Sequence, residues 1–179
     1  MQPSAPDLWE NYFQLFAQQP SFEIDAAQLD QCYRALQGQI HPDKYAHLSE
    51  AEQRVAMQRS TQVNEAYQTL RNPLARARYL LSLQGVDTAE ETNTAMQADF
   101  LMAQMEWREA IAEAGQAHEL DELATRLRQE TRELEAQLAV AIDRDKNYPN
   151  AAIMVRKLRF MEKLAESLHS AYDTIDNQG

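Results

Sequence analysis

Apolar residues recur every three or four positions along most of this chain, which is the spacing of amphipathic helices. The first half contains four such stretches, beginning with the aromatic-rich segment 8–17 (LWENYFQLFA). Behind Asp25, a predicted N-cap, one helical face carries Leu29, Cys32, Tyr33, Leu36 and Ile40. This stripe is predicted to be buried, so Cys32 is interpreted as a core residue rather than a nucleophile.

Start and stop signals divide the remaining part of the first half. Pro42 disfavours helical geometry at His41 and should end the second helix there. Ser49 and Glu52 have the spacing of a capping box that starts a third helix. A fourth helix is expected to start at Asn72-Pro73 and to end at Gly85.

The second half has a different organisation. Segment 85–97 shows no apolar periodicity and is predicted to be a connector. Three longer helical patterns follow, and short polar turns join them, which is typical of a small antiparallel bundle. Their apolar stripes comprise Phe100, Ala103, Trp107, Ala110 and Ala114; Leu120, Leu123, Leu127, Leu134, Leu138 and Ala141; and Met154, Leu158, Met161, Ala165, Leu168, Tyr172 and Ile175.

Composition supports an all-α protein and narrows its class. The 179 residues include only four glycines and six prolines, which leaves little room for the turns of a β fold. A single cysteine excludes a disulfide framework and favours a reducing cytoplasm. No apolar run is long enough to span a membrane, and no signal peptide is recognisable. The net charge of −11 argues against non-specific nucleic-acid binding.

The charge is unevenly distributed, with −9 of the −11 in residues 85–179. This asymmetry suggests two units with different surfaces, residues 1–84 and residues 85–179, although a well-solvated surface would also explain it.

The tetrapeptide His41-Pro42-Asp43-Lys44 lies between two well-capped helices and has three possible explanations. It could be an ordinary turn, since proline and aspartate are common turn residues. It could be a metal or hydrolytic site with His47, but the spacing of the two histidines does not place them on one helical face, and no further cluster supports a site. It could also be a recognition loop, because a stiff loop between two anchored helices docks at low entropic cost.

The surroundings of the loop favour recognition. An aromatic helix, an amphipathic helix, the HPDK loop and a capped helix containing NEAYQTLRNP together resemble a J domain, the module that stimulates ATP hydrolysis by DnaK-type chaperones. LARARYLLSLQG, DFLMAQMEWREAI and VRKLRFMEKL extend this resemblance to the HscB family of iron–sulfur assembly co-chaperones over almost the whole chain.

The resemblance implies a J domain that engages an HscA/DnaK-type chaperone and an acidic three-helix bundle that binds the IscU-type scaffold. His41, Pro42, Asp43 and Lys44 would make the chaperone contact without performing chemistry, so the protein is expected not to be an enzyme. One departure from J domains is the second helix, where residues 26–40 carry only Arg34 against Asp30. Lys44, Arg71, Arg76 and Arg78 would have to supply positive potential instead. Some eukaryotic relatives carry a cysteine-rich zinc module near the N-terminus. That region has no cysteine here, so no zinc and no cofactor is expected.

The first bundle helix carries a second apolar patch. Leu101, Met102 and Met105 lie opposite the Trp107 stripe, beside Glu106 and Glu109. A small bundle needs only one buried stripe per helix, so the second patch is either a partner site or a contact with the first unit.

The resemblance favours a scaffold-binding site and adds Arg159 and Phe160 to it, although Phe160 could instead be buried in the bundle. A J-domain adaptor for a different client remains the alternative function, and a small helical metalloenzyme is a more distant one.

Overall fold

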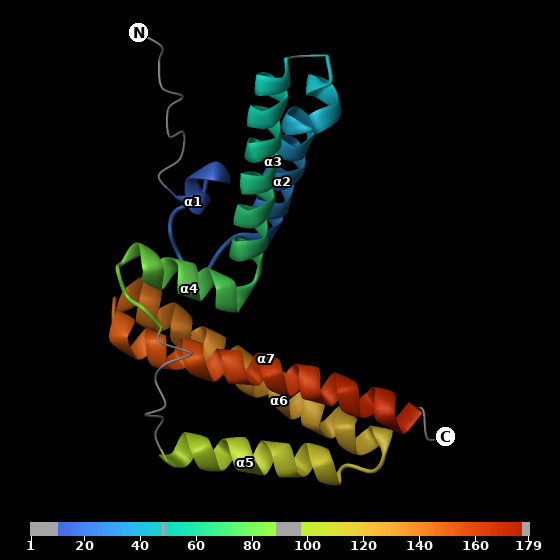
Figure 1. Cartoon of the computed structure of the whole chain (residues 1–179). Coiled ribbons are helices and arrows are strands. Elements are labelled where there is room, and N and C mark those ends of the chain that lie inside the picture. The colour runs from blue at the N-terminus through green and yellow to red at the C-terminus, as the bar shows by residue number, and fades with distance from the viewer. Residues whose placement is uncertain (1–10, 48, 89–97, 177–179) are drawn as a thin grey trace. The chain divides into compact units, whose positions relative to one another are not determined.

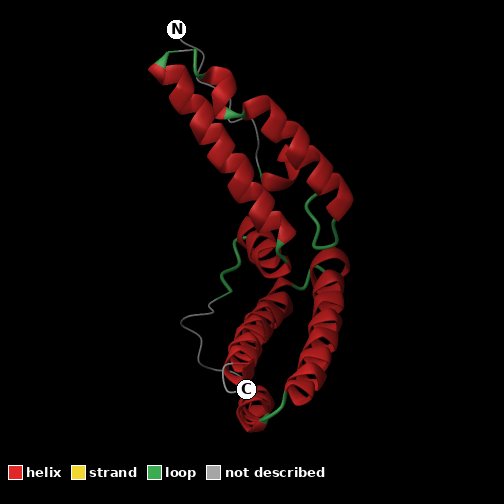
Figure 2. Ribbon diagram, turned by 90° about the vertical axis from the view of Figure 1, so that its right-hand side faces the viewer, coloured by secondary structure: helices red, strands yellow, loops and turns green. Residues whose placement is uncertain are grey.

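A computed structural model describes residues 11–47, 49–88 and 98–176, and these residues form helices and loops without strands (Figure 2). The all-α prediction is confirmed. The chain divides into two compact units, residues 1–80 and 81–179. The elements are α1 (Tyr12–Leu15), α2 (Ala26–Ile40), the 3₁₀ turn η1 (Pro42–Tyr45), α3 (Glu50–Arg71), α4 (Pro73–Leu83), α5 (Ala98–Glu113), α6 (Ala117–Ala139), the π-helical turn η2 (Val140–Arg144) and α7 (Tyr148–Asp176).

In the first unit, α2 and α3 lie side by side as an antiparallel hairpin with η1 at its tip (Figure 1). The predicted caps are present. The Asp25 carboxylate accepts the Gln28 N–H at 2.9 Å, and Ser49 and Glu52 form a reciprocal capping box. Helix α1 is shorter than expected, and the part of the predicted helix at residues 8–10 lies outside the described residues.

The hairpin is fastened by an aromatic and polar contact between its two helices. The rings of Tyr33 and Tyr67 stack with centroids 3.8 Å apart. The Tyr67 hydroxyl donates to Asp30 at 2.9 Å, and Arg71 forms a salt bridge with the same carboxylate. The hydrogen bonds from Arg71 and Tyr67 lower the pKa of Asp30 below its ordinary value. Cys32 of α2, predicted to be a core residue, is only partly buried.

Helix α4 ends as predicted. Gly85 has φ +70°, a left-handed conformation that glycine adopts without strain. The Gly85 N–H donates to Ser82 O at 2.9 Å and the Val86 N–H donates to Leu81 O at 2.9 Å. These two bonds form a Schellman motif, which satisfies the last carbonyl groups of the helix. Of the predicted connector, residues 89–97 lie outside the described residues.

In the second unit, α6 and α7 form a long antiparallel pair, and α5 packs along one side of it (Figure 1). Seven buried residues make its core next to α5: Phe100, Trp107, Leu120, Leu127, Phe160, Leu164 and Leu168. The predicted three-helix arrangement is therefore present, with one error of detail. Ala165 was placed on the buried stripe of α7, but it is exposed and Leu164 is buried. None of the helices in the described part of the chain combines the length and hydropathy that crossing a membrane requires.

Candidate protein-interaction sites

The HPDK loop is a compact turn that closes on itself. Helix α2 stops at Ile40, because Pro42 holds His41 in an extended conformation with φ −58° and ψ 129°. Pro42 then opens η1. The Asp43 N–H donates to Nδ1 of His41 at 3.3 Å, and the Lys44 N–H donates to His41 O at 3.0 Å. Local hydrogen bonds therefore fix the backbone from His41 to Lys44, on which the side chains are displayed.

Both ends of the loop are fixed to the hairpin. The Tyr45 hydroxyl donates to Gln39 O at 3.2 Å, and the Gln53 amide donates to Ala46 O at 3.2 Å. The side chains of His41 and Asp43 still face solvent, with 56% and 89% of them exposed. Nδ1 of His41 lies 3.5 Å from a carboxylate oxygen of Asp43. The imidazole and the carboxylate are thus held next to each other on a stiff support.

Some of the cations in the first unit make contacts within that unit. Arg71 is committed to Asp30. Arg76 is buried, with its guanidinium 4.9 Å from the Phe22 ring centroid and hydrogen-bonded to Leu70 O. On α2, Arg34 donates to the Asp30 carbonyl at 3.3 Å. Arg76, one of the four cations expected to supply positive potential, is therefore buried and is not displayed at the surface for direct contact with a partner.

Helix α5 has the two apolar faces that its sequence predicts. On its inner face, Phe100 and Trp107 are buried, at 8% and 2% exposure. On its outer face, Leu101, Met102 and Met105 are 47%, 61% and 72% exposed. Glu106 and Glu109 are exposed beside them. We call these five outer residues the α5 face; it is an apolar ridge with an acidic border.

The inner face of α5 is held by aromatic contacts from the other two helices. Phe160 of α7 meets Phe100 edge to face, with ring centroids 5.3 Å apart. The Arg126 guanidinium of α6 lies 4.5 Å from the Trp107 centroid, and its Nε donates to Glu130 at 2.8 Å. Sequence reasoning missed Arg126, since a cation placed over a ring from another helix leaves no periodic signal.

The structure does not bring all the predicted scaffold residues to one surface. Phe160 is 7% exposed and belongs to the core, which is the alternative that its sequence position left open. Arg159 is half-buried. Phe160 therefore supports α5 from inside, whereas the α5 face itself is open to solvent.

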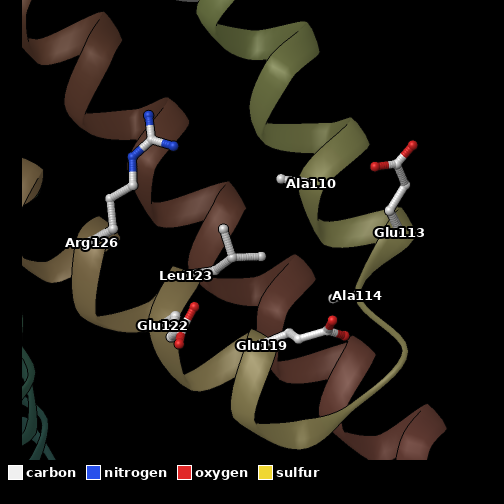
Figure 3. Close-up of a pocket in the computed structure, with 7 residues that line it drawn as sticks. All are labelled: Ala110, Glu113, Ala114, Glu119, Glu122, Leu123 and Arg126. Carbon is white, nitrogen blue, oxygen red and sulfur yellow. The ribbon is translucent and has the colours of Figure 1, made fainter.

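A cleft of about 470 Å³ lies between α5 and α6 near the turn that joins them. Figure 3 shows Leu123 and Ala110 facing the space between the two helices, with Glu113 and Arg126 on opposite sides of it. Glu119 is used locally, since its carboxylate accepts the N–H groups of Gly115 and Gln116 at 2.8 and 3.0 Å. The cleft continues the acidic character of the α5 face onto α6.

Metal chemistry has no candidate site in the described residues. No group of three or more histidine, cysteine, aspartate or glutamate side chains is placed there to hold an ion. The arrangement of both sites suits protein recognition, because each displays solvent-exposed polar or apolar groups on a helical support.

Comparison with known proteins finds a family model for each part of the chain. Residues 17–79 match the family model described as DnaJ domain, and residues 96–169 match the one described as HSCB C-terminal oligomerisation domain. A co-chaperone protein HscB homolog from Azoarcus sp. (strain BH72) is 49% identical over 176 residues, which cover 97% of this chain and 99% of the relative. The homolog from Chromobacterium violaceum is 51% identical over 170 residues, covering 94% and 97%.

Solved structures lead to the same family. Chaperone HscB from Vibrio cholerae superposes with a TM-score of 0.83 at 37% identity, covering 92% of this chain and 99% of that one. The human co-chaperone protein HscB gives a TM-score of 0.87 at 33% identity, covering 92% and 83%. The predicted resemblance is confirmed: the chain belongs to the HscB family of J-domain co-chaperones.

Proposed function

We propose that this co-chaperone couples two partners through separate surfaces. The HPDK loop stimulates ATP hydrolysis by a DnaK/HscA-type chaperone, and the α5 face carries an IscU-type iron–sulfur scaffold to that chaperone. The observation that supports this most directly is the exposed aliphatic ridge of Leu101, Met102 and Met105 in a chain that also carries a fixed HPDK loop. A protein with only a chaperone to contact would gain nothing from exposing that ridge.

The loop acts by selecting a state of the chaperone. Asp43 offers a carboxylate and His41 an imidazole at fixed separation, and Lys44 adds a neighbouring cation. Because the loop is already ordered, little conformational entropy is lost on docking. The protein shifts the chaperone toward its hydrolysing state and performs no bond chemistry itself. Helix α2 carries only Arg34 against Asp30, so electrostatic steering from this helix would be weak and the affinity would come mainly from contacts formed after encounter.

The scaffold is held by apolar anchors within a charged border. Leu101, Met102 and Met105 supply the anchors, and Glu106 and Glu109 select a partner with basic groups at the rim. Arg159 contributes from α7, and Phe160 acts through Phe100 by fixing the register of α5.

We place the functional boundary at Gly85, where α4 ends, so that the J domain is 1–84 and the scaffold-binding bundle is 85–179. A cut at residue 80 would sever α4, whereas a cut at Gly85 leaves the helix whole. Fragment 85–179 is expected to melt cooperatively, to bind scaffold and to leave the chaperone ATPase unstimulated. A fragment without helical circular dichroism would show that the boundary is misplaced.

The decisive experiment measures ATP turnover by a purified HscA-type chaperone and by DnaK, each with this protein, with and without an IscU-type scaffold. Synergy with the scaffold is expected. Stimulation that ignores the scaffold would favour the alternative, a J-domain adaptor for a different client. Turnover by this protein alone would contradict a purely regulatory role. The single, partly buried cysteine is compatible with action in the cytoplasm.

A further inference from the structure

Two clefts separate α5 from α6, one on each side of a contact made by Trp107. The cleft of about 470 Å³ lies between residues 110–114 of α5 and residues 119–126 of α6. A second cleft, of about 390 Å³, lies between residues 100–107 of α5 and residues 130–137 of α6, with α7 as its third wall. Figure 3 shows Arg126 at the end of the first cleft away from the turn that joins the two helices.

Three side chains meet between the clefts, Trp107 of α5 with Arg126 and Glu130 of α6, and we call them the Trp107 clasp. The Arg126 guanidinium lies 4.5 Å from the centroid of the buried Trp107 ring, and its Nε donates to Glu130 at 2.8 Å. The Arg126 side chain is 56% exposed, so the guanidinium covers the ring while its outer side remains hydrated. The indole face attracts the cation, and the carboxylate keeps the cation in place.

The clasp is one of two contacts that together fix the direction of α5. The other is the edge-to-face contact of Phe100 with Phe160 of α7. Trp107 lies about two turns farther along the helix, and beyond it the inner face continues with Ile111 and Ala114, which are only partly buried. A helix held at one point can swing about it, whereas a second point sets its axis. Because clefts flank the clasp, few neighbouring atoms oppose a displacement of α5 towards α6.

We propose that Arg126 is a positioning residue for scaffold binding, which it supports through Trp107 without touching the scaffold. The inference rests on the proposed function, in which the scaffold contacts both the α5 face and Arg159 of α7. A partner that spans two helices requires α5 to be held at one place against the bundle, and the clasp does this from α6. Without Arg126, α5 shifts towards a cleft, and the α5 face no longer matches the scaffold although the core stays buried.

The test uses the full-length protein with Arg126→Ala and two matched variants. Arg126→Lys keeps a cation that can lie over the ring. Arg132→Ala removes an exposed arginine of α6 that lines neither cleft. The measurements are the Kd for a purified IscU-type scaffold by calorimetric titration, the melting temperature, and the rate of amide hydrogen exchange along α5, α6 and α7 in the free protein.

Arg126→Ala is expected to raise the Kd by roughly fivefold, the order of a lost cation–π contact that is partly shielded from water. Amide exchange should become faster in α5 and stay the same in α6 and α7, and the protein should still melt cooperatively. Arg126→Lys should keep most of the affinity, and Arg132→Ala should change the Kd less than about twofold. An equal loss of affinity in Arg126→Lys and Arg126→Ala would overturn the role given to the cation.

A double-mutant cycle separates positioning from direct contact. If Arg126 acts through the ring, Arg126→Ala adds no further loss of affinity in a Trp107→Leu background. A further loss of the same size would show that Arg126 touches the scaffold and would overturn the proposal, as would an unchanged Kd for folded Arg126→Ala.

Hydrogen exchange judges the proposal without the cycle. If Trp107→Leu does not fold, unchanged exchange along α5 in Arg126→Ala overturns the proposal, and faster exchange confined to α5 supports it. If the natural chain binds no scaffold, the proposed function fails, whereas the exchange rates still show whether Arg126 positions α5.

Discussion

The HPDK loop and the α5 face, which we propose as the two partner sites, both expose side chains to solvent, but the fold holds them in different ways. The loop is set by short-range contacts, chiefly Pro42 and the N–H groups that bond to His41. The α5 face is set from a distance, through Phe100 and Trp107 on the opposite side of the helix and their contacts with α6 and α7. In the loop, the residues proposed to contact a partner and the residues that position them are therefore neighbours in sequence. In α5, the two groups lie on opposite faces of the helix.

This difference determines how mutations should behave. In the loop, a side chain can be changed without touching the core, so a variant should lose function and keep its stability. In α5, function can be lost in two ways, by removing an outer anchor or by loosening the inner face. Four tests, using five variants, address this contrast.

The largest effect is expected at Asp43. Asp43→Asn removes a charge from a side chain that is 89% exposed. Stimulation of the chaperone should fall to the unstimulated rate, because a truncated charge pair at an interface costs about 2–5 kcal/mol. The melting temperature should not change. Glu50→Gln changes an exposed carboxylate in the first turn of α3 and is the control. Equal stimulation by both variants would remove the loop from the mechanism.

Trp107→Ala tests the inner face of α5. The side chain is 2% exposed and lies under the Arg126 guanidinium. Its loss should lower the free energy of unfolding of the second unit by about 3–5 kcal/mol. Denaturant melts followed by circular dichroism measure this. If stability is unchanged while scaffold binding weakens, Trp107 belongs to the binding surface and the two faces are assigned backwards.

The outer face should give the reverse result. Leu101→Ala and Met105→Ala should each weaken scaffold binding by about 1–3 kcal/mol in calorimetric titration, and melting should stay the same because no cavity forms. Val140→Ala removes an aliphatic side chain that is 40% exposed elsewhere in the unit, and it should leave affinity unchanged. Destabilisation by either α5 variant would contradict the assignment.

The smallest effect concerns the hairpin that supports the loop. Arg71 and Tyr67 lower the pKa of Asp30 in the folded chain. A lowered folded pKa stabilises the fold above the unfolded pKa, and this contribution is lost as pH falls through the folded pKa. Asp30→Asn should therefore slightly lower the melting temperature at neutral pH and match the natural chain in acid. Melts from pH 7 to pH 2 measure it, with Asp43→Asn as control; a difference independent of pH would exclude this cause.

Much of the fold follows from local signals in the sequence. Asp25, Ser49 with Glu52, Pro42 and Gly85 each act on neighbouring backbone groups, so their effects are visible without tertiary structure. The two faces of α5 also followed from 3.6-residue periodicity, which placed Trp107 inside and Met105 outside.

The errors occur where a distant partner decides the outcome. Phe160 lies at the edge of its helical stripe, and only the position of Phe100 on another helix settles that it is buried. Arginine is a residue type usually found at the surface, but contacts with the Phe22 ring and the Leu70 carbonyl hold Arg76 inside the fold. Ala165 lost its predicted place to Leu164, although Leu158 and Leu168 are buried as predicted, because steps of three and of four residues from Met161 both fit a helical stripe.

The outer face of α5 also has a chemical vulnerability. Met102 and Met105 present their thioethers at 61% and 72% exposure, and methionine sulfur is oxidised to a polar, chiral sulfoxide that reductase enzymes can reverse. Oxidation there would place dipoles on the apolar ridge without disturbing the core. The neighbouring Leu101 side chain has no sulfur and would stay unchanged. Under the proposed function, peroxide would therefore act on the scaffold-binding surface, whereas the HPDK loop contains no methionine and would keep its side chains unchanged.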